Sequence, residues 1–198
     1  MSTIALVMTV ALAQNVVLVH YLGIYPLAAV VRSPRRAFFM SLATTAALVW
    51  VGLVHWALYR YVLLPLDVTI LSTISLATVI AVTSVLVLRI GSYLFPFYRR
   101  QLRQGAPAAL VNVTVFVVVM ALVENVSSLP HVMAGAVAAG AGMMLALVPI
   151  AAVRLELRHR KVPWILQGDV VVYLAVAMMA LAIQQIDGLL HQFFIPLY

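Results

Sequence analysis

Long apolar runs recur along the chain, separated by short segments that are polar, basic or broken by proline. Each run is close to the ~20 residues that a helix needs to cross the hydrocarbon core of a bilayer. The runs lie at about 3–30, 37–58, 66–90, 107–124, 131–153 and 168–188. They predict an all-α integral membrane protein, with six transmembrane helices in a single membrane domain over residues 1–198.

The composition supports a bilayer rather than water as the surroundings. Hydrophobic residues make up 66% and charged residues 9% of the 198 positions, and the mean hydropathy is +1.14. A soluble domain carries about 25% charged residues, so this chain has too few to cover its surface in water. The formal charge of +7 does not indicate nucleic acid, because the basic residues lie in loops rather than on one face. The first run lacks the basic start of a signal peptide and is expected to be retained.

The basic residues are confined to alternate loops. Arg60 is the only one of the 12 Lys and Arg residues that lies outside the first, third and fifth loops or their edges. Basic residues in short loops stay cytoplasmic. The three loops are therefore predicted to face the cytoplasm of a bacterial inner membrane, with both termini periplasmic.

The six spans divide into two sets of three, at about 1–95 and about 105–198. Because three is odd, the fourth span enters the membrane from the side opposite to the first, so related halves form an inverted repeat. Spans one and four carry amides at depth, namely Gln14, Asn15 and Asn112. Gly23 and Pro26 break the first span. The amides either hydrogen-bond neighbouring helices or hold the backbone of interrupted helices one and four around a central site.

Few residues suit chemistry within the membrane. Asp67, Glu124 and Asp187 fall at the outer ends of spans, where solvated carboxylates are the ordinary reading and ion entry is the alternative. His20 and His55 could hold a haem if they faced each other, although their spacing does not demand it. The chain has no cysteine, and no metal-binding, phosphate-binding or hydrolase motif is found.

Several segments carry a resemblance to a known family. They are NVVLVHYLGIYPLAAV (15–30), SLATTAALV (41–49), YVLLPLDVTILSTISLATVIAV (61–82), RLELRHRKVPWILQG (154–168) and AMMALAIQQIDGL (177–189). In this order they resemble the A subunit of the Rnf electron-transport complex and the homologous E subunit of the sodium-pumping NADH:quinone reductase. The resemblance implies a membrane subunit of an ion-translocating oxidoreductase complex. Its expected partners are a homologous six-span subunit of opposite topology and other subunits that bear flavin or iron–sulfur groups.

The chain departs from that family at the cluster ligands. In the family, interrupted helices one and four each carry a cysteine, and the partner adds two more to an intramembrane 2Fe–2S cluster. The family motifs are LG-x-CP and TTNC, whereas this chain has LGIYP and LVNVT. Tyr25 and Val113 therefore occupy the vacated cluster positions. Because the chain offers no thiolate, we expect it to bind no cofactor by itself, and Tyr25 to fill the vacated volume.

Three functions remain open on the sequence alone. The leading prediction is a cluster-free subunit that serves as scaffold or as part of the coupling core of an Rnf-like or Nqr-like complex. The second is a small inverted-repeat transporter or channel without redox chemistry. The third is a structural subunit recruited to another membrane complex. Neighbouring genes for flavin-bearing and ferredoxin-like subunits would favour the first, a lone gene the second, and genes of an unrelated complex the third.

Overall fold

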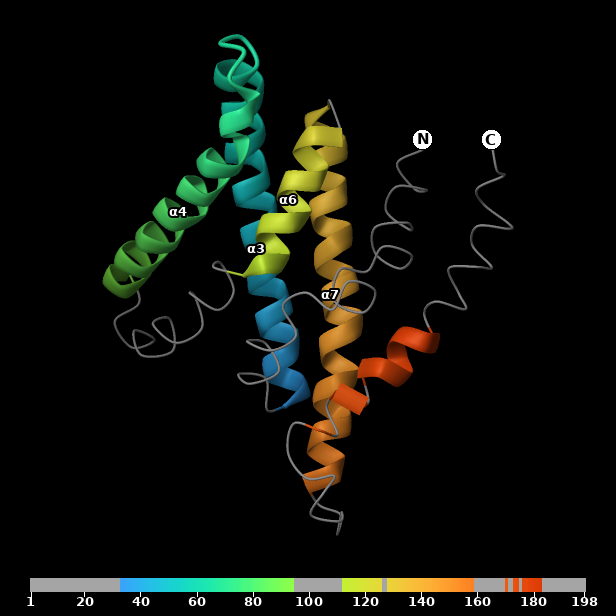
Figure 1. Cartoon of the computed structure of the whole chain (residues 1–198). Helices are drawn as coiled ribbons and strands as arrows, with labels where there is room; N and C mark the ends of the chain where they lie inside the picture. The colour runs from blue at the N-terminus through green and yellow to red at the C-terminus, as the bar shows by residue number, and fades with distance from the viewer. Residues whose placement is uncertain are drawn as a thin grey trace, which may run out of the picture. The chain divides into compact units, whose positions relative to one another are not determined.

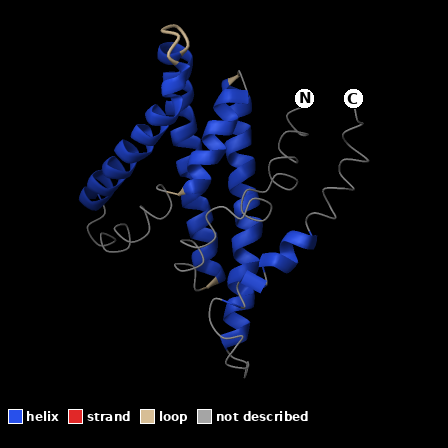
Figure 2. Cartoon of the chain, in the orientation of Figure 1, coloured by secondary structure: helices blue, strands red, loops and turns tan. Residues whose placement is uncertain are grey.

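The computed structural model describes residues 33–94, 112–125, 128–158, 170, 173–174 and 176–182 (Figure 1). Within these ranges the chain forms helices joined by loops and contains no strand (Figure 2). The segments Pro34–Leu63, Thr69–Arg89 and Leu129–Glu156 are each long and apolar enough to cross a bilayer. The protein is therefore an all-α integral membrane protein, as the apolar runs predict. The predicted first span and the predicted boundary between the repeats lie outside the described residues.

Three helices begin directly after a polar residue. They are α3 (Pro34–Leu58), α6 (Val113–Asn125) and α7 (Leu129–Arg158), preceded by Ser33, Asn112 and Ser128. Ser33 accepts at Oγ from the backbone N–H of Arg36 at 3.4 Å, which satisfies one of the unpaired donors of the first turn. Pro34 suits the first helical position because no intrahelical partner awaits its missing N–H.

The connection between α3 and α4 (Ser72–Leu94) is a tight turn rather than the start of a span. After α3 the chain forms a π-helical turn at Tyr59–Leu63 and a 3₁₀ turn at Thr69–Leu71. Between these turns Asp67 has a φ of 54°, a left-handed conformation that Asp tolerates better than most residues. The predicted span 66–90 thus begins too early, because Pro65 cannot donate a helical hydrogen bond and the chain reverses at Asp67.

The chain divides into two compact units, one of residues 1–42 with 138–198, and one of residues 43–137. In the second unit α6 buries one face, formed by Thr114, Val115, Val118, Val119, Leu122 and Val123. The spacing of these residues is that of one helical face. Along α4, in contrast, only a narrow stripe is buried, with Leu76 and Ile80 at its centre. The remaining apolar surface of α4 suits contact with lipid or with another membrane chain.

In the first unit the buried face of α7 includes Met143, Leu147 and Ile150, and the helical segment 176–182 buries Val176 and Ala180. The helix passes through Pro149 without ending, as membrane helices tolerate. It also runs to Arg158, beyond the predicted end of the span at residue 153. The predicted fifth loop therefore begins too early, because residues 154–158 are good helix formers whose long basic side chains can reach the membrane surface.

Candidate functional site

The vacated cluster positions fall on two parts of the chain. Tyr25 lies outside the described residues, together with Gln14, Asn15, Gly23 and Pro26. Val113 and Asn112 are described and lie at the start of α6. The part of the candidate site that the structure describes is therefore the start of α6.

Asn112 caps α6. Its side-chain Oδ1 accepts from the backbone N–H of Thr114 at 3.1 Å, and its main-chain carbonyl accepts from the N–H of Phe116 at 3.2 Å. The residue is only 3% exposed. A capping Asn satisfies one first-turn donor, so the helix begins at Val113 because its capping group stands just before it.

Val113 is the first residue of α6, and 56% of its surface is exposed. Its isopropyl group has no lone pair and cannot ligate iron. The next residue, Thr114, is buried at 1% exposure, and its hydroxyl is a weak ligand for the soft iron of a cluster. The described residues at this position therefore do not fit a 2Fe–2S cluster.

If the C-terminal end of α6 lies near a membrane surface, the length of the helix places its N-terminal end within the hydrocarbon core of the bilayer. The helix has 13 residues, which span about 20 Å at 1.5 Å per residue. The hydrocarbon core is about 30 Å thick. A single helix of this length does not cross it, and the capping residue at its start, Asn112, is buried.

A second polar group lies at the junction of three helices. His55 of α3 is fully buried, and its Nε2 lies 3.3 Å from Oγ of Ser72, the first residue of α4. Ser72 Oγ also lies 4.0 Å from Sδ of Met120 on α6. The ring of His55 lies 6.4 Å from that of Tyr59, which begins the π-helical turn. π-helical turns are often found at functional sites.

The sequence singles out His55 but neither Ser72 nor Met120. Ser72 carries a usable signal, since a serine after a turn is a common helix start. Met120 carries none, because a methionine in an apolar helix has no distinguishing pattern. Nδ1 of His55 has no hydrogen-bond partner in the described part of the chain. His20, the other histidine considered for a haem, lies outside the described residues.

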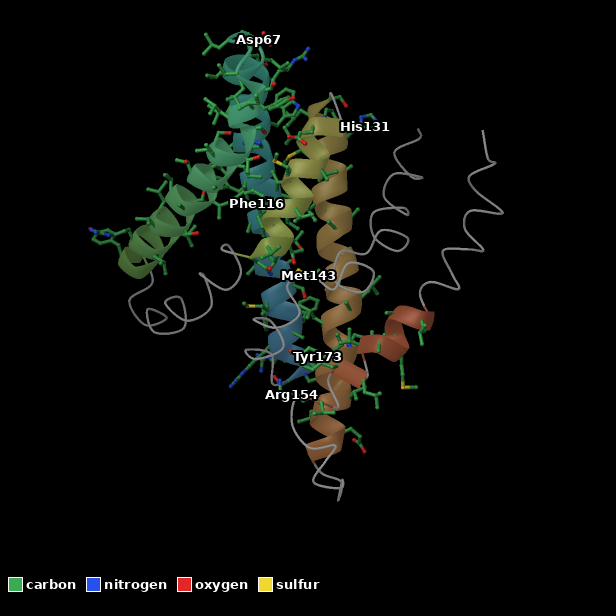
Figure 3. All side chains as sticks on the ribbon, in the orientation of Figure 1. Asp67, Phe116, His131, Met143, Arg154 and Tyr173 are labelled. Atoms are coloured by element: carbon green, nitrogen blue, oxygen red, sulfur yellow. The ribbon has the colours of Figure 1, made fainter. Side chains whose placement is uncertain are left out.

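The predicted ion-entry carboxylates are not brought together by any contact within the described ranges. Asp67 is exposed at the tip of the turn before α4, and Figure 3 places it at the same end of its unit as His131. Glu124 is exposed near the end of α6. Asp187 lies outside the described residues. Among the residues that the structure describes, no group of three or more His, Cys, Asp or Glu side chains could hold a metal ion.

Comparisons with known proteins cover nearly the whole chain. Residues 3–190 match the family model of the Rnf-Nqr subunit, a membrane protein. The chain is 33% identical to the A subunit of the ion-translocating oxidoreductase complex of Ectopseudomonas mendocina, over 96% of this chain and 99% of that protein. It is 32% identical to the protein of the same name from Actinobacillus pleuropneumoniae serotype 5b, over 94% and 96% of the two chains. The chain thus belongs to the Rnf-Nqr family of membrane subunits.

Proposed function

We propose that this chain is a membrane subunit of an ion-translocating oxidoreductase complex, and that it serves as scaffold or as part of the coupling core. The observation that carries the proposal is the extent of the match, since the chain spans 99% of a relative named as the A subunit of such a complex. A similarity of this length includes every span and loop, rather than one shared module.

We further propose that the chain takes part without a cluster of its own. The sequence has no cysteine, and Val113 offers no donor atom at the position that matches the family's second ligand. Electrons would then pass through other subunits of the complex. Tyr25 would fill part of the volume that a cluster occupies in the family, as a large aromatic side chain does in a buried site.

The proposed partner is a homologous six-span subunit of opposite topology, within a larger complex whose other subunits bear flavin or iron–sulfur groups. The proposed location is a bacterial inner membrane, with both termini periplasmic and loops one, three and five cytoplasmic. The confinement of the basic residues to those loops supports this orientation. Six spans in two inverted repeats, with helices one and four interrupted, agree with the short α6 and its buried cap.

A tagged full-length chain, purified from native membranes in mild detergent, tests the proposal. We expect it to bring down redox subunits with flavin or iron–sulfur absorbance, whereas an equally tagged unrelated inner-membrane protein does not. Recovery of the chain alone, or with subunits of a complex without redox groups, would contradict the proposed function. A separate measurement addresses the cluster. Once the chain is stripped of partners it should contain no stoichiometric iron, and one or two iron atoms per chain would overturn the cluster-free assignment alone.

A further inference from the structure

The start of α6 holds one buried side-chain nitrogen, Nδ2 of Asn112, that has no hydrogen-bond partner in the described part of the chain. Oδ1 of Asn112 is already used by the N–H of Thr114. This bond also settles which way the amide points, because the reversed amide would set two donors against each other. Nδ2 of Asn112 is buried and has no hydrogen-bond partner. The amide therefore presents its two N–H groups beside the end of the helix.

The backbone of the same turn adds donors of its own. The first N–H groups of a helix have no intrahelical acceptor, and at the start of α6 the side chain of Asn112 accepts from the N–H of Thr114. The aligned peptide dipoles place a partial positive charge at this end. A buried amide donor without an acceptor costs free energy comparable to a lost hydrogen bond. Both features favour the same kind of ligand, a group that accepts hydrogen bonds and carries negative charge.

The surroundings limit the charge of that group. The α6 sequence, VTVFVVVMALVEN, contains no basic residue, so within α6 only dipoles are available to balance an anion. Its single acid, Glu124, lies 12 positions after Asn112, which is about 18 Å along a helix. Within α6, therefore, no side-chain cation and no nearby carboxylate acts at the cap. Such a site suits one negative charge rather than the two or more of a phosphate group.

The first residue of the helix is exposed although the cap beside it is buried. Val113 has 56% of its surface exposed, and Asn112 has 3%. The depth expected for this end makes the donors stronger, since a dipole acts over a longer range where water is scarce. Half-helices that end at depth are a known way to hold anionic groups in membrane proteins.

We propose that Nδ2 of Asn112 and backbone N–H groups at the N-terminus of α6 form a binding site for a small monovalent anion, with chloride as the physiological candidate. The site requires neither electron transfer nor a cluster, and it goes beyond the proposed function. The bound anion would accept a hydrogen bond from the buried Nδ2 of Asn112, which has no partner in the described part of the chain.

The full-length chain in lipid nanodiscs allows a direct test with sodium chloride as the probe. The Tm is measured as chloride replaces gluconate at constant sodium concentration. An anion that binds only the folded state raises Tm, and we expect a rise of roughly 3–5 °C at ten times the dissociation constant. Loss of this rise is expected in Asn112→Asp, which retains a capping oxygen but replaces the donor with a negative charge. Asn112→Ser retains a capping oxygen without the amide, and we expect it to lose most of the rise.

Ser84→Ala is the matched control, because Ser84 is buried and bonds to the carbonyl of Ile80 on its own helix at 2.8 Å. This variant should keep the full response to chloride. The absence of any chloride-specific rise in the unmodified chain would overturn the proposal, whether or not the variants fold. An equal rise in Asn112→Asp and in the unmodified chain would also overturn it, because the anion would then bind elsewhere.

Discussion

Oγ of Ser72 lies 3.3 Å from Nε2 of His55, joining two helices through residues that are 17 positions apart. Both residues are buried, at 1% and 0% exposure. In an apolar interior a histidine that loses its partner keeps a desolvated nitrogen without compensation. This pair, with Sδ of Met120 beside it, therefore ties the α3–α4 turn to α6.

Ser72→Ala should lower the free energy of unfolding by about 1–2 kcal/mol, because it removes a buried interhelical hydrogen bond and leaves His55 unsatisfied. Reversible unfolding in mixed micelles measures the change. Thr78→Ala is the matched control, since Thr78 is exposed and bonds to the carbonyl of Ile74 on its own helix. Equal losses in both variants would show that the His55–Ser72 contact contributes nothing specific.

Gly135→Ala should destabilise the contact between α6 and α7. A Cβ at Gly135 would collide with the side chain of Leu122, and forcing an extra methyl into a packed interior costs about 1–3 kcal/mol. The free energy of unfolding reports the loss. Gly52→Ala is the control, because its Cβ would lie 3.7 Å from Cγ1 of Val132, an ordinary contact.

Leu122→Ala supplies a second arm for the Gly135 prediction. In that background the collision is absent, and Gly135→Ala should become neutral or stabilising by up to about 1 kcal/mol through helix propensity. If Gly135→Ala destabilises the chain equally in both backgrounds, the steric explanation is wrong.

Reporter fusions test the proposed orientation. An alkaline phosphatase fused after Tyr198 should be active, because both termini are predicted to be periplasmic. A green fluorescent protein inserted after Arg103, in the third loop, should fluoresce because that loop is predicted to be cytoplasmic. The reciprocal fusions serve as controls. An inactive phosphatase together with a fluorescent protein after Tyr198 would reverse the topology.

The vacated cluster positions can be tested by introduced thiols, and the absence of native cysteine makes the background clean. In Tyr25→Cys with Val113→Cys we expect a short bifunctional maleimide to link the two thiols within one chain, because the family resemblance sets both positions at one site. Each single substitution serves as a control and should give no internal link. A double variant that also stays unlinked would separate Tyr25 from Val113 and refute the inherited site.

The same double variant tests the partner. It supplies two of the four thiolates that a 2Fe–2S cluster needs, so iron reconstitution should yield cluster absorbance only when a partner brings two more. A cluster formed by the isolated double variant within one chain would contradict that expectation.

Much of the protein's character follows from the sequence alone. Hydropathy is a local property, so apolar runs of sufficient length predict membrane helices without any knowledge of their neighbours. The expectation of an all-α membrane protein is confirmed by α3, α4 and α7, and the resemblance to Rnf-type subunits is confirmed by the family match. The predicted helix bounds are less accurate. Hydropathy does not distinguish a turn from a helix, either at Pro65 and Asp67 or after Val153.

Only the tertiary structure decided which polar residues meet. Ser72 and Met120 are 48 positions apart, and no periodic pattern indicates that Met120 lies beside the serine that contacts His55. The close approach between position 135 and Leu122 depends on a side chain from another helix. The bond that makes Asn112 a cap, and leaves its Nδ2 without an acceptor in the described chain, depends on where α6 begins. Side-chain contacts between helices depend on which helix faces pack together. The apolar residues that form these faces are nearly interchangeable in sequence. Their pairing therefore cannot be predicted from composition or spacing.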